Sequence, residues 1–379
     1  MTFTQMVELP PLDISPVHAH ITILPNESGQ YTAYVMTEMS VSTIPLRLKP
    51  HDVKNLNLLL QKAIQQVARS FGKKEPYVAA LEELARMGSY AFQRIFSDPS
   101  SQDAIRNALN TGMIVQIASK DFFIPWELLY DGPLDERASI SYYWGMRHII
   151  SRAIIQDVRP GAQASPLLEG KRPKVGLIAF DKLSYVVRQE LPALRELHRK
   201  RRIQLALLRE LTAIQRSTEL AELGRFLSQD WHILHVACHA YERDPLEQSY
   251  LLITKDFALS MIDFVVGQYE LKHHPFVILN ACLTGTINPL YTSSWAETLW
   301  ERGARGVLAT DFQVPDWFAA SFSEKLYEHL LSGLSIGEAL VTIRHHLWTE
   351  HSNLLGLAYA LYSSPSIKIV RSKKKVKMV

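Results

Sequence analysis

Two apolar segments of this chain each carry a side chain that can do nucleophilic or acid–base chemistry. The segment of residues 233–240 carries His239, and the segment of residues 276–285 carries Cys282. A free thiol has a pKa of about 8.5, so it supplies little thiolate at neutral pH. A neighbouring imidazole either accepts the thiol proton or, as a cation, lowers the thiol pKa. The pair therefore predicts a cysteine nucleophile with a histidine base.

Both segments have the continuous apolar pattern of strands that are buried on both faces of a parallel sheet. Open parallel sheets place reactive groups just past the carboxyl ends of such strands. His239 and Cys282 are 43 positions apart (282 minus 239). Because both residues end neighbouring parallel strands, we expect His239 and Cys282 to meet at one edge of the sheet.

Residues next to this pair have predicted supporting roles. Cys238 is the rival nucleophile, but adjacent strand residues point to opposite faces, so we interpret Cys238 as a packing residue. Backbone N–H groups around Cys282 and Ala240 are candidate oxyanion donors, because small residues let a substrate approach. Asn280 is expected to brace and position this region rather than to react.

Composition places the chain among globular proteins of one large or two ordinary domains, with 379 residues of which 47% are apolar. Only two cysteines are present, so we expect no disulfide framework and a reducing compartment. We find no run of about 18 apolar residues and no signal-peptide pattern in the first residues. The predicted location is the cytoplasm, without a membrane span.

The net charge of +3 comes from the C-terminus. Six basic residues lie in the last twelve positions, so the remaining chain carries +3 minus 6, or −3. We therefore expect no direct nucleic-acid binding by the body of the chain. The basic tail, residues 371–379, is expected to be a solvated end, with a weak contact to nucleic acid or anionic lipid as the alternative.

Changes in hydrophobic period divide the chain into a smaller α+β domain at 1–155, a linker at 156–173 and an α/β domain at 174–370. In the α/β domain strands alternate with helices, which predicts a mostly parallel sheet sandwiched by helices. Glu127, among aromatic residues, either organises a buried hydrogen-bond network or faces water. Within the first domain, we predict strands at 20–24, 31–35, 41–48, 113–118 and 142–150 and helices at 55–71, 77–96 and 103–109.

Metal and cofactor chemistry are not expected. The pairs His273–His274 and His345–His346 have no Cys or carboxylate partners at ligand spacing. No glycine-rich loop that would cradle a phosphate is present. We therefore predict no metal site and no cofactor.

Residues 235–240 and 277–285 resemble the two catalytic motifs of the CHAT family, which are caspase-like cysteine peptidases related to separase. Other segments match in order and spacing, and the resemblance covers roughly residues 110–365. It implies a caspase-like sheet with His239 as base and Cys282 as nucleophile. The further matching segments are 125–129, 295–310, 314–316 and 333–340.

The resemblance also implies endopeptidase activity on protein substrates, commonly in bacterial defence, including antiviral defence, or programmed death. Family members often carry a degenerate first half of the same architecture, and residues 1–155 are a candidate for one. The sequence departs from the family where the histidine is usually followed by glycine. Here Ala240 follows, which keeps its N–H but disfavours positive φ.

Related peptidases that cut after Arg or Lys hold an acidic residue in the substrate pocket. By this resemblance Asp316 is a candidate pocket residue, and Asp311 is a second one. A buried carboxylate that pairs with a substrate guanidinium gives strong discrimination. The alternative for Asp316 is an N-cap of the helix that begins at Trp317.

Three functions remain open. The first is an active cysteine endopeptidase that cleaves after a basic residue. The second is a latent protease, switched on by a separate nucleic-acid or nucleotide sensor or by an activating protein or ribonucleoprotein. The third is a catalytically inactive scaffold for protein interactions, against which the presence of both His239 and Cys282 argues.

Overall fold

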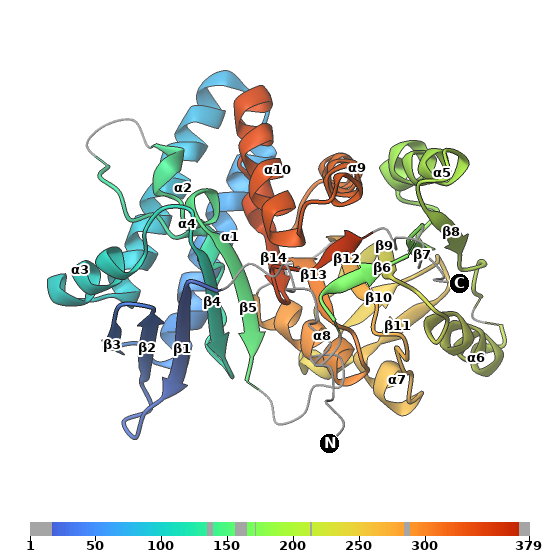
Figure 1. The fold of residues 1–379 in the computed structure, drawn as a ribbon, viewed down its shortest axis with the longest axis horizontal. Coiled ribbons are helices and arrows are strands. Elements are labelled where there is room, and N and C mark those ends of the chain that lie inside the picture. The colour runs from blue at the N-terminus through green and yellow to red at the C-terminus, as the bar shows by residue number, and fades with distance from the viewer. Residues whose placement is uncertain are drawn as a thin grey trace, which may run out of the picture.

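The chain forms two large β-sheets that meet at their edges, with helices on their faces (Figure 1). Residues of β5 (Ile149–Ile154), at the edge of the first sheet, lie within 8 Å, Cα to Cα, of residues of β14 (Tyr359–Tyr362) in the second. Buried apolar side chains from both sheets form one continuous core. The structure is a computed structural model that describes residues 17–134, 139–155, 165–170, 172–212, 214–283 and 289–370.

The first sheet has the strand order β3-β2-β1-β4-β5. Strands β1, β2 and β3 are antiparallel, whereas β4 is parallel to both β1 and β5. Buried residues alternate along β1 and β2, which is the pattern of strands with one face on a core. The other elements are β1 (Ala19–Pro25), β2 (Tyr31–Thr37), β3 (Val41–Leu46), α1 (Pro50–Ser70), α2 (Lys74–Ile95), α3 (Pro99–Ala108) and β4 (Ile114–Ser119).

The predicted strand at 142–150 is wrong for most of its length. Over this range the chain completes a 3-10 turn, Ile140–Tyr142, and makes a helical turn, α4 (Trp144–Arg147), before β5 begins. An earlier 3-10 turn is Trp126–Leu128. Aromatic packing explains the difference, because the ring of Trp144 stacks on Trp126 at a centroid distance of 6.0 Å. A helical turn points this large ring into the core, whereas the sequence pattern of apolar residues alone does not distinguish it from a strand.

The second sheet is mostly parallel, as the sequence predicted, and three of its strands are antiparallel to their neighbours. Strands β8, β7, β9, β12 and β13 run parallel, and β10, β11 and β14 run antiparallel to their neighbours. The strands are β7 (Lys174–Ala179), β8 (Gln204–Leu207), β9 (Ile233–Tyr241), β10 (Tyr250–Leu252), β11 (Ala258–Ser260), β12 (Phe276–Leu283) and β13 (Gly306–Thr310).

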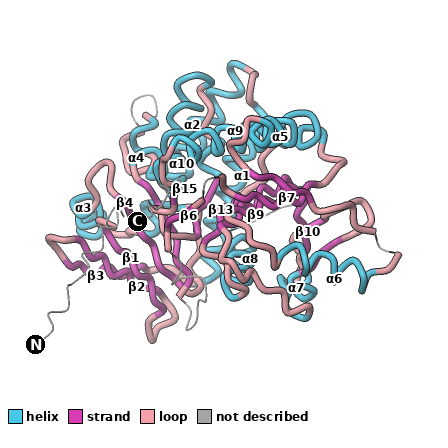
Figure 2. The backbone as a smooth tube through the Cα atoms, turned by 45° about the vertical axis from the view of Figure 1, so that its right-hand side comes forward, coloured by secondary structure: helices cyan, strands magenta, loops and turns pink. Residues whose placement is uncertain are grey.

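Helices cover both sides of this sheet (Figures 1 and 2). Helices α5, α9 and α10 lie on one side, and α6, α7 and α8 lie on the other. A π-helical turn, Val186–Glu190, leads directly into α5. The helices are α5 (Leu191–Arg199), α6 (Arg216–Leu227), α7 (Met261–Val266), α8 (Pro289–Glu301), α9 (Asp316–Ser332) and α10 (Ile336–His351), with 3-10 turns at Leu246–Gln248 and Leu355–Ala358.

Part of the predicted linker is a strand. Within 156–173, β6 (Leu167–Glu169) pairs in parallel with β15 (Lys368–Val370) near the C-terminus. Residues 156–164 and 171 of the linker, and the predicted basic tail at 371–379, lie outside the described residues. Among the described residues, no helix is long and apolar enough to cross a bilayer.

Strand β9 changes its neighbour partway along one edge. Its first half, from Ile233 to Ala237, pairs with β7, and its last part, from His239, pairs with β10. The neighbour of β9 on this side therefore changes at Cys238, and His239 is the first residue of β9 that pairs with β10.

Candidate active site

His239 and Cys282 occupy opposite positions at the ends of two adjacent parallel strands. The register of β9 and β12 runs from Ile233 opposite Phe276 to Ala240 opposite Leu283, with His239 opposite Cys282. Neighbouring strands lie about 4.8 Å apart. Reactive groups were expected just past the carboxyl ends of the strands, whereas both positions lie within the paired part of β9 and β12. The motif residues Thr284 and Gly285 lie outside the described residues.

His239 is partly exposed, and two aromatic rings lie close to its imidazole. The ring of Phe180 meets it edge-on, with centroids 5.2 Å apart, and the ring of Tyr241 lies at 6.4 Å. The backbone N–H of Phe180 donates to the carbonyl of Ala237 over 2.8 Å, directly after β7 ends. The end of β7 therefore places an aromatic ring against the imidazole and limits its orientation.

The other residues at this end of β9 are buried. Cys238 is 0% exposed, and burial raises the pKa of its thiol well above the ordinary value. A thiol that stays protonated is a poor nucleophile, so the interpretation of Cys238 as a packing residue is confirmed. Ala240 is also 0% exposed and lies within the extended strand, a conformation that alanine adopts without strain.

Asn280 lies two residues before Cys282 on β12 and is held by three hydrogen bonds. Its amide nitrogen donates to Glu190 over 2.8 Å and to the carbonyl of Ala319 over 3.2 Å. The Tyr359 hydroxyl donates to the Asn280 carbonyl oxygen over 2.7 Å. These bonds tie β12 to α9, β14 and the turn before α5, just behind the two strand ends.

Glu190 extends this buried polar network to β9. Its Oε1 lies 2.9 Å from Nε2 of His235, and Nδ1 of His235 lies 3.1 Å from the Tyr327 hydroxyl. The rings of His235 and Tyr327 stack with an interplanar angle of 7°. Burial, followed by the charge of Glu190, raises the pKa of Tyr327 well above its usual value, so the hydroxyl stays a donor.

Sequence reasoning missed Glu190 and His235, although one signal was present. Leu183, Val186, Glu190 and Leu194 follow each other at helical spacing, and the three apolar members are buried. A glutamate within the apolar stripe of a helix indicates a buried carboxylate that needs a partner.

Asp311 lies in a second buried network, at the junction of the two sheets. Its Oδ2 lies 2.6 Å from Nη1 of Arg152, whose other guanidinium nitrogen pairs with Glu127. Burial alone would lower the Arg152 pKa, but the charges of Asp311 and Glu127 outweigh it and hold the pKa above its ordinary value. The expectation of a buried network around Glu127 is confirmed. Asp311 has a cationic partner inside the protein.

Asp316 is the first residue of α9, and Pro315 is the N-cap. Its Oδ1 accepts a hydrogen bond from the backbone N–H of Trp317 over 2.9 Å. The helix thus starts one residue earlier than an Asp316 cap would require. The carboxylate is partly exposed, at a helix N-terminus that stabilises negative charge.

Two cavities flank the strand ends. One, of about 190 Å³, lies between the end of β7 and the segment after β10, and its lining includes Ala179, Val186 and Thr254. The other, of about 400 Å³, lies between α1 and the segment after β9, and its lining includes Asn57 and Glu242. Glu242 follows His239 by three residues, so it lies within about 11 Å of it.

Over the ranges that the structure describes, no group of three or more His, Cys, Asp or Glu side chains is arranged to hold a metal ion.

Comparison with known proteins bears on the family and the fold. The family model of the CHAT domain matches residues 91–366. Two crystal structures of the Saccharomyces cerevisiae separase–securin complex match with TM-scores of 0.53 and 0.50 at 12% identity, over 93% of this chain and 30% of that chain. The Drosophila initiator caspase Dronc matches with a TM-score of 0.31 at 8% identity, over 56% of this chain and 90% of that chain.

The comparison with curated proteins gives no match. The chain spans about a third of the length of the separase chains, so the likeness concerns the fold.

Proposed function

This chain belongs to the CHAT domain family, and from that premise we propose that it is a cysteine endopeptidase with Cys282 as nucleophile and His239 as base. The observation that carries the proposal is the register of β9 and β12, which sets these two residues opposite each other. Cys238, the other cysteine, is buried with a raised thiol pKa and is unsuited to the role.

In the proposed reaction, His239 accepts the Cys282 thiol proton, and the thiolate attacks the carbonyl carbon of the scissile peptide bond. Backbone N–H groups near Ala240 and Cys282 stabilise the oxyanion of the tetrahedral intermediate. The C–N bond then breaks, and the imidazolium gives its proton to the leaving amine. Water, deprotonated by His239, hydrolyses the thioester and restores the thiol.

We further propose that cleavage follows a basic residue and that the Asp316 carboxylate faces it. Asp316 is partly exposed, and the charge of a carboxylate at this position attracts a guanidinium or ammonium group. Asp311 would contribute only if its pairing with Arg152 were exchanged for a substrate group.

The proposal also covers the setting of the activity. We place it in the cytoplasm, in a bacterial defence or cell-death pathway, with a protein partner that controls it. The separase structures that this fold matches contain securin as a bound protein. A latent protease would cleave only after the partner is added, which separates this form of the proposal from constitutive activity.

The deciding experiment profiles a peptide library with the wild-type protein, Cys282→Ala and Cys238→Ala. We expect cleavage by the wild type, loss of at least about 10³-fold in Cys282→Ala, and retention in Cys238→Ala if it folds. Mass spectrometry after treatment with a peptidyl electrophile should show the label on Cys282. Cleavage that persists in Cys282→Ala would refute the assignment.

Asp316→Asn tests the pocket, because it removes the charge and keeps an oxygen for the Trp317 N–H. We expect kcat/KM for substrates with Arg or Lys before the cleaved bond to fall about 10- to 100-fold. Substrates with a neutral residue there should change little. An unaltered basic preference would remove Asp316 from the pocket.

A further inference from the structure

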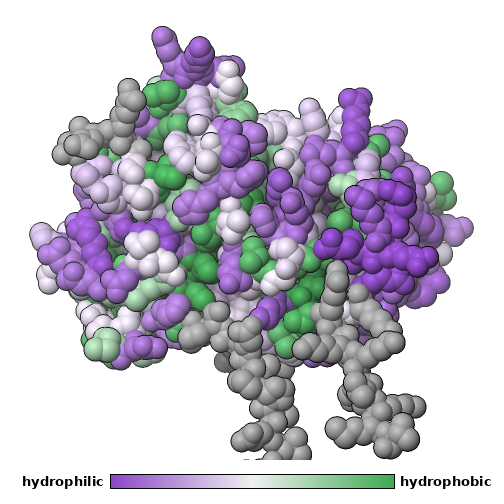
Figure 3. All heavy atoms as spheres, turned by 45° about the horizontal axis from the view of Figure 1, so that its top comes forward, coloured by the Kyte–Doolittle hydropathy of each residue, from purple (hydrophilic) through white to green (hydrophobic). Residues whose placement is uncertain are grey.

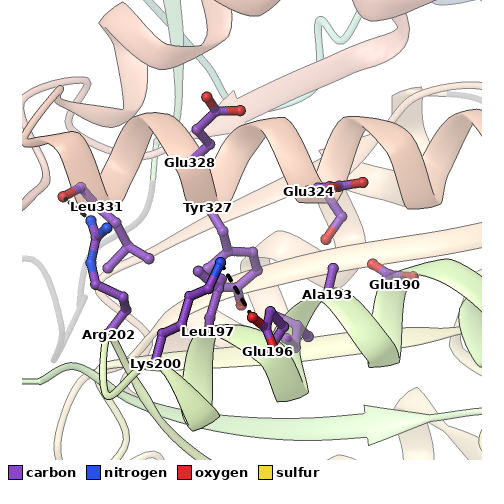
Figure 4. A pocket seen from close by; sticks show the side chains of 12 residues that line it. Glu190, Ala193, Glu196, Leu197, Lys200, Arg202, Glu324, Tyr327, Glu328 and Leu331 are labelled. Atoms are coloured by element: carbon purple, nitrogen blue, oxygen red, sulfur yellow. Dashed lines mark hydrogen bonds and ion pairs between the residues drawn. The ribbon is translucent and has the colours of Figure 1, made fainter.

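A cleft separates α5 from α9, on the side of the sheet away from α8 (Figure 4). Its volume is about 250 Å³, and its lining comes from one side of each helix. Glu190, Ala193 and Lys200 lie on the α5 side, and Ser323 and Glu324 lie on the α9 side. The surface around α5 is strongly hydrophilic, at the right of Figure 3. This cleft plays no part in the proposed peptide cleavage.

Two buried polar atoms in the lining lack hydrogen-bond partners among the described residues. They are Oε2 of Glu190 and Oγ of Ser323, and both residues are 2% exposed. Only Oε1 of Glu190 is used, by Asn280 and His235. A buried carboxylate oxygen without a hydrogen-bond donor lowers the stability of the fold. A ligand group that donates to this oxygen therefore gains more binding free energy than it would from a carboxylate at the surface.

Charged side chains of both signs line the cleft, with the two cations together at one end and four carboxylates, Glu190, Glu196, Glu324 and Glu328. Figure 4 shows Glu190 and Glu324 at one end and Lys200 and Arg202 at the other. Lys200 follows Glu190 by ten residues, which corresponds to about 15 Å along a helix. This separation is too long for a single amino acid and matches four to five residues of an extended peptide.

We propose that the cleft between α5 and α9 binds an extended peptide segment of a partner protein. A Lys or Arg side chain of this segment lies at Glu190 and Glu324. An Asp or Glu side chain, four to five residues away, lies near Lys200 and Arg202. The guanidinium or ammonium group supplies the donor that Oε2 of Glu190 lacks. The cavity volume fits one basic side chain, while the rest of the segment lies along the groove. The acidic side chain of the segment lies near Lys200 and Arg202. Of these, Lys200 already forms an ion pair with Glu196 over 3.2 Å.

The test measures fluorescence anisotropy of the labelled peptide Arg-Ala-Leu-Ala-Glu and of its reversed sequence. The protein is the full chain carrying Cys282→Ala, so that binding is read without cleavage and independently of the proposed protease activity. We expect saturable binding of one orientation, and a loss of at least about tenfold when citrulline replaces arginine. Free agmatine should compete weakly, because it supplies the cation without the acidic end.

Matched variants locate the site. Glu324→Gln should weaken binding about fivefold, and Ala193→Leu, which fills the cleft without touching the buried network, should abolish it. Arg195→Ala, on the exposed side of α5, is the control and should bind as before. Equal affinity for the citrulline peptide, unchanged binding by Ala193→Leu, or no binding at millimolar peptide would each overturn the proposal.

Discussion

Buried charged and polar side chains give this molecule its most specific contacts. Arg152, Glu127 and Asp311 are each at most 4% exposed, and together they join the two sheets. An arginine in such a place is stable only because both carboxylates accompany it. From the sequence, Glu127 could be suspected of burial because aromatic residues surround it. Arg152 gave no such signal, because its partners come from distant segments.

At the ends of β9 and β12, too, some residues could be placed from the sequence and others could not. The opposite placement of His239 and Cys282 could be predicted from the sequence, since both end apolar runs that are typical of neighbouring parallel strands. Glu190 could not be placed, because its partners Asn280 and His235 lie 90 and 45 positions away (280 minus 190 and 235 minus 190). A polar side chain reveals its partner only when the fold is known.

His148 predicts a pH dependence of stability. It is 0% exposed, and burial, helped by the charge of Arg147, lowers its pKa from 6.5 to about 3. Below pH 6.5 the unfolded state binds a proton that the folded state does not, so stability falls with pH until about pH 3. Between pH 7.5 and 5.0 His148 should remove about 2 kcal/mol from the free energy of unfolding.

Urea denaturation of His148→Gln at both pH values checks this contribution. The difference between the two pH values should shrink by about 2 kcal/mol relative to the wild type. The comparison remains valid if the substitution lowers stability at both pH values. An unchanged difference would show that the folded His148 titrates normally.

At the scale of elements, the two central strands were the most predictable part of the chain. Both β9 and β12 are largely apolar runs, and their parallel pairing fits the crossover connection between them, which contains β10, β11 and the helix α7. The segment at 142–150 was predicted wrongly because Trp144 and its aromatic neighbours satisfy the burial pattern of a strand while forming a helical turn. The change of partner along β9 could not be predicted, since β10 is only three residues long.

Asn280 provides a test of how firmly β12 is held. Asn280→Ala leaves the Glu190 carboxylate, the Ala319 carbonyl and the Tyr359 hydroxyl without their shared partner. We expect the free energy of unfolding to fall by about 3 kcal/mol, measured by urea denaturation. Tyr359→Phe removes only one of the three bonds and should cost about 1 kcal/mol. A cost below that of Tyr359→Phe would contradict this role for Asn280.

At the scale of the whole molecule, the two sheets share one hydrophobic core. The family model starts at residue 91, inside α2, yet the first sheet needs β1, β2 and β3 from before that point. The apolar core is continuous from the first sheet to the second. The change in hydrophobic period that suggested a linker at 156–173 falls between two sheets that share one buried core.

A fragment of residues 174–370 should therefore fail to fold alone. It would expose the face of β14 that adjoins β5 and leave Asp311 buried without Arg152. We expect the fragment to lack a cooperative thermal transition by circular dichroism. Co-expression with residues 1–173 should restore a soluble complex with the melting behaviour of the intact chain. A cooperative transition in the fragment alone would refute this dependence.

Eight consecutive residue pairs of β9 and β12 hold His239 opposite Cys282, independently of the loop that follows β9. A slip by one residue would send His239 to the opposite face of the sheet, so the ladder fixes the spacing of the reactive groups. The loop at 242–249 takes no part in that ladder. Under the endopeptidase activity proposed above, insertions or exchanges in this loop should therefore change which peptides are accepted and leave the opposite placement of His239 and Cys282 intact.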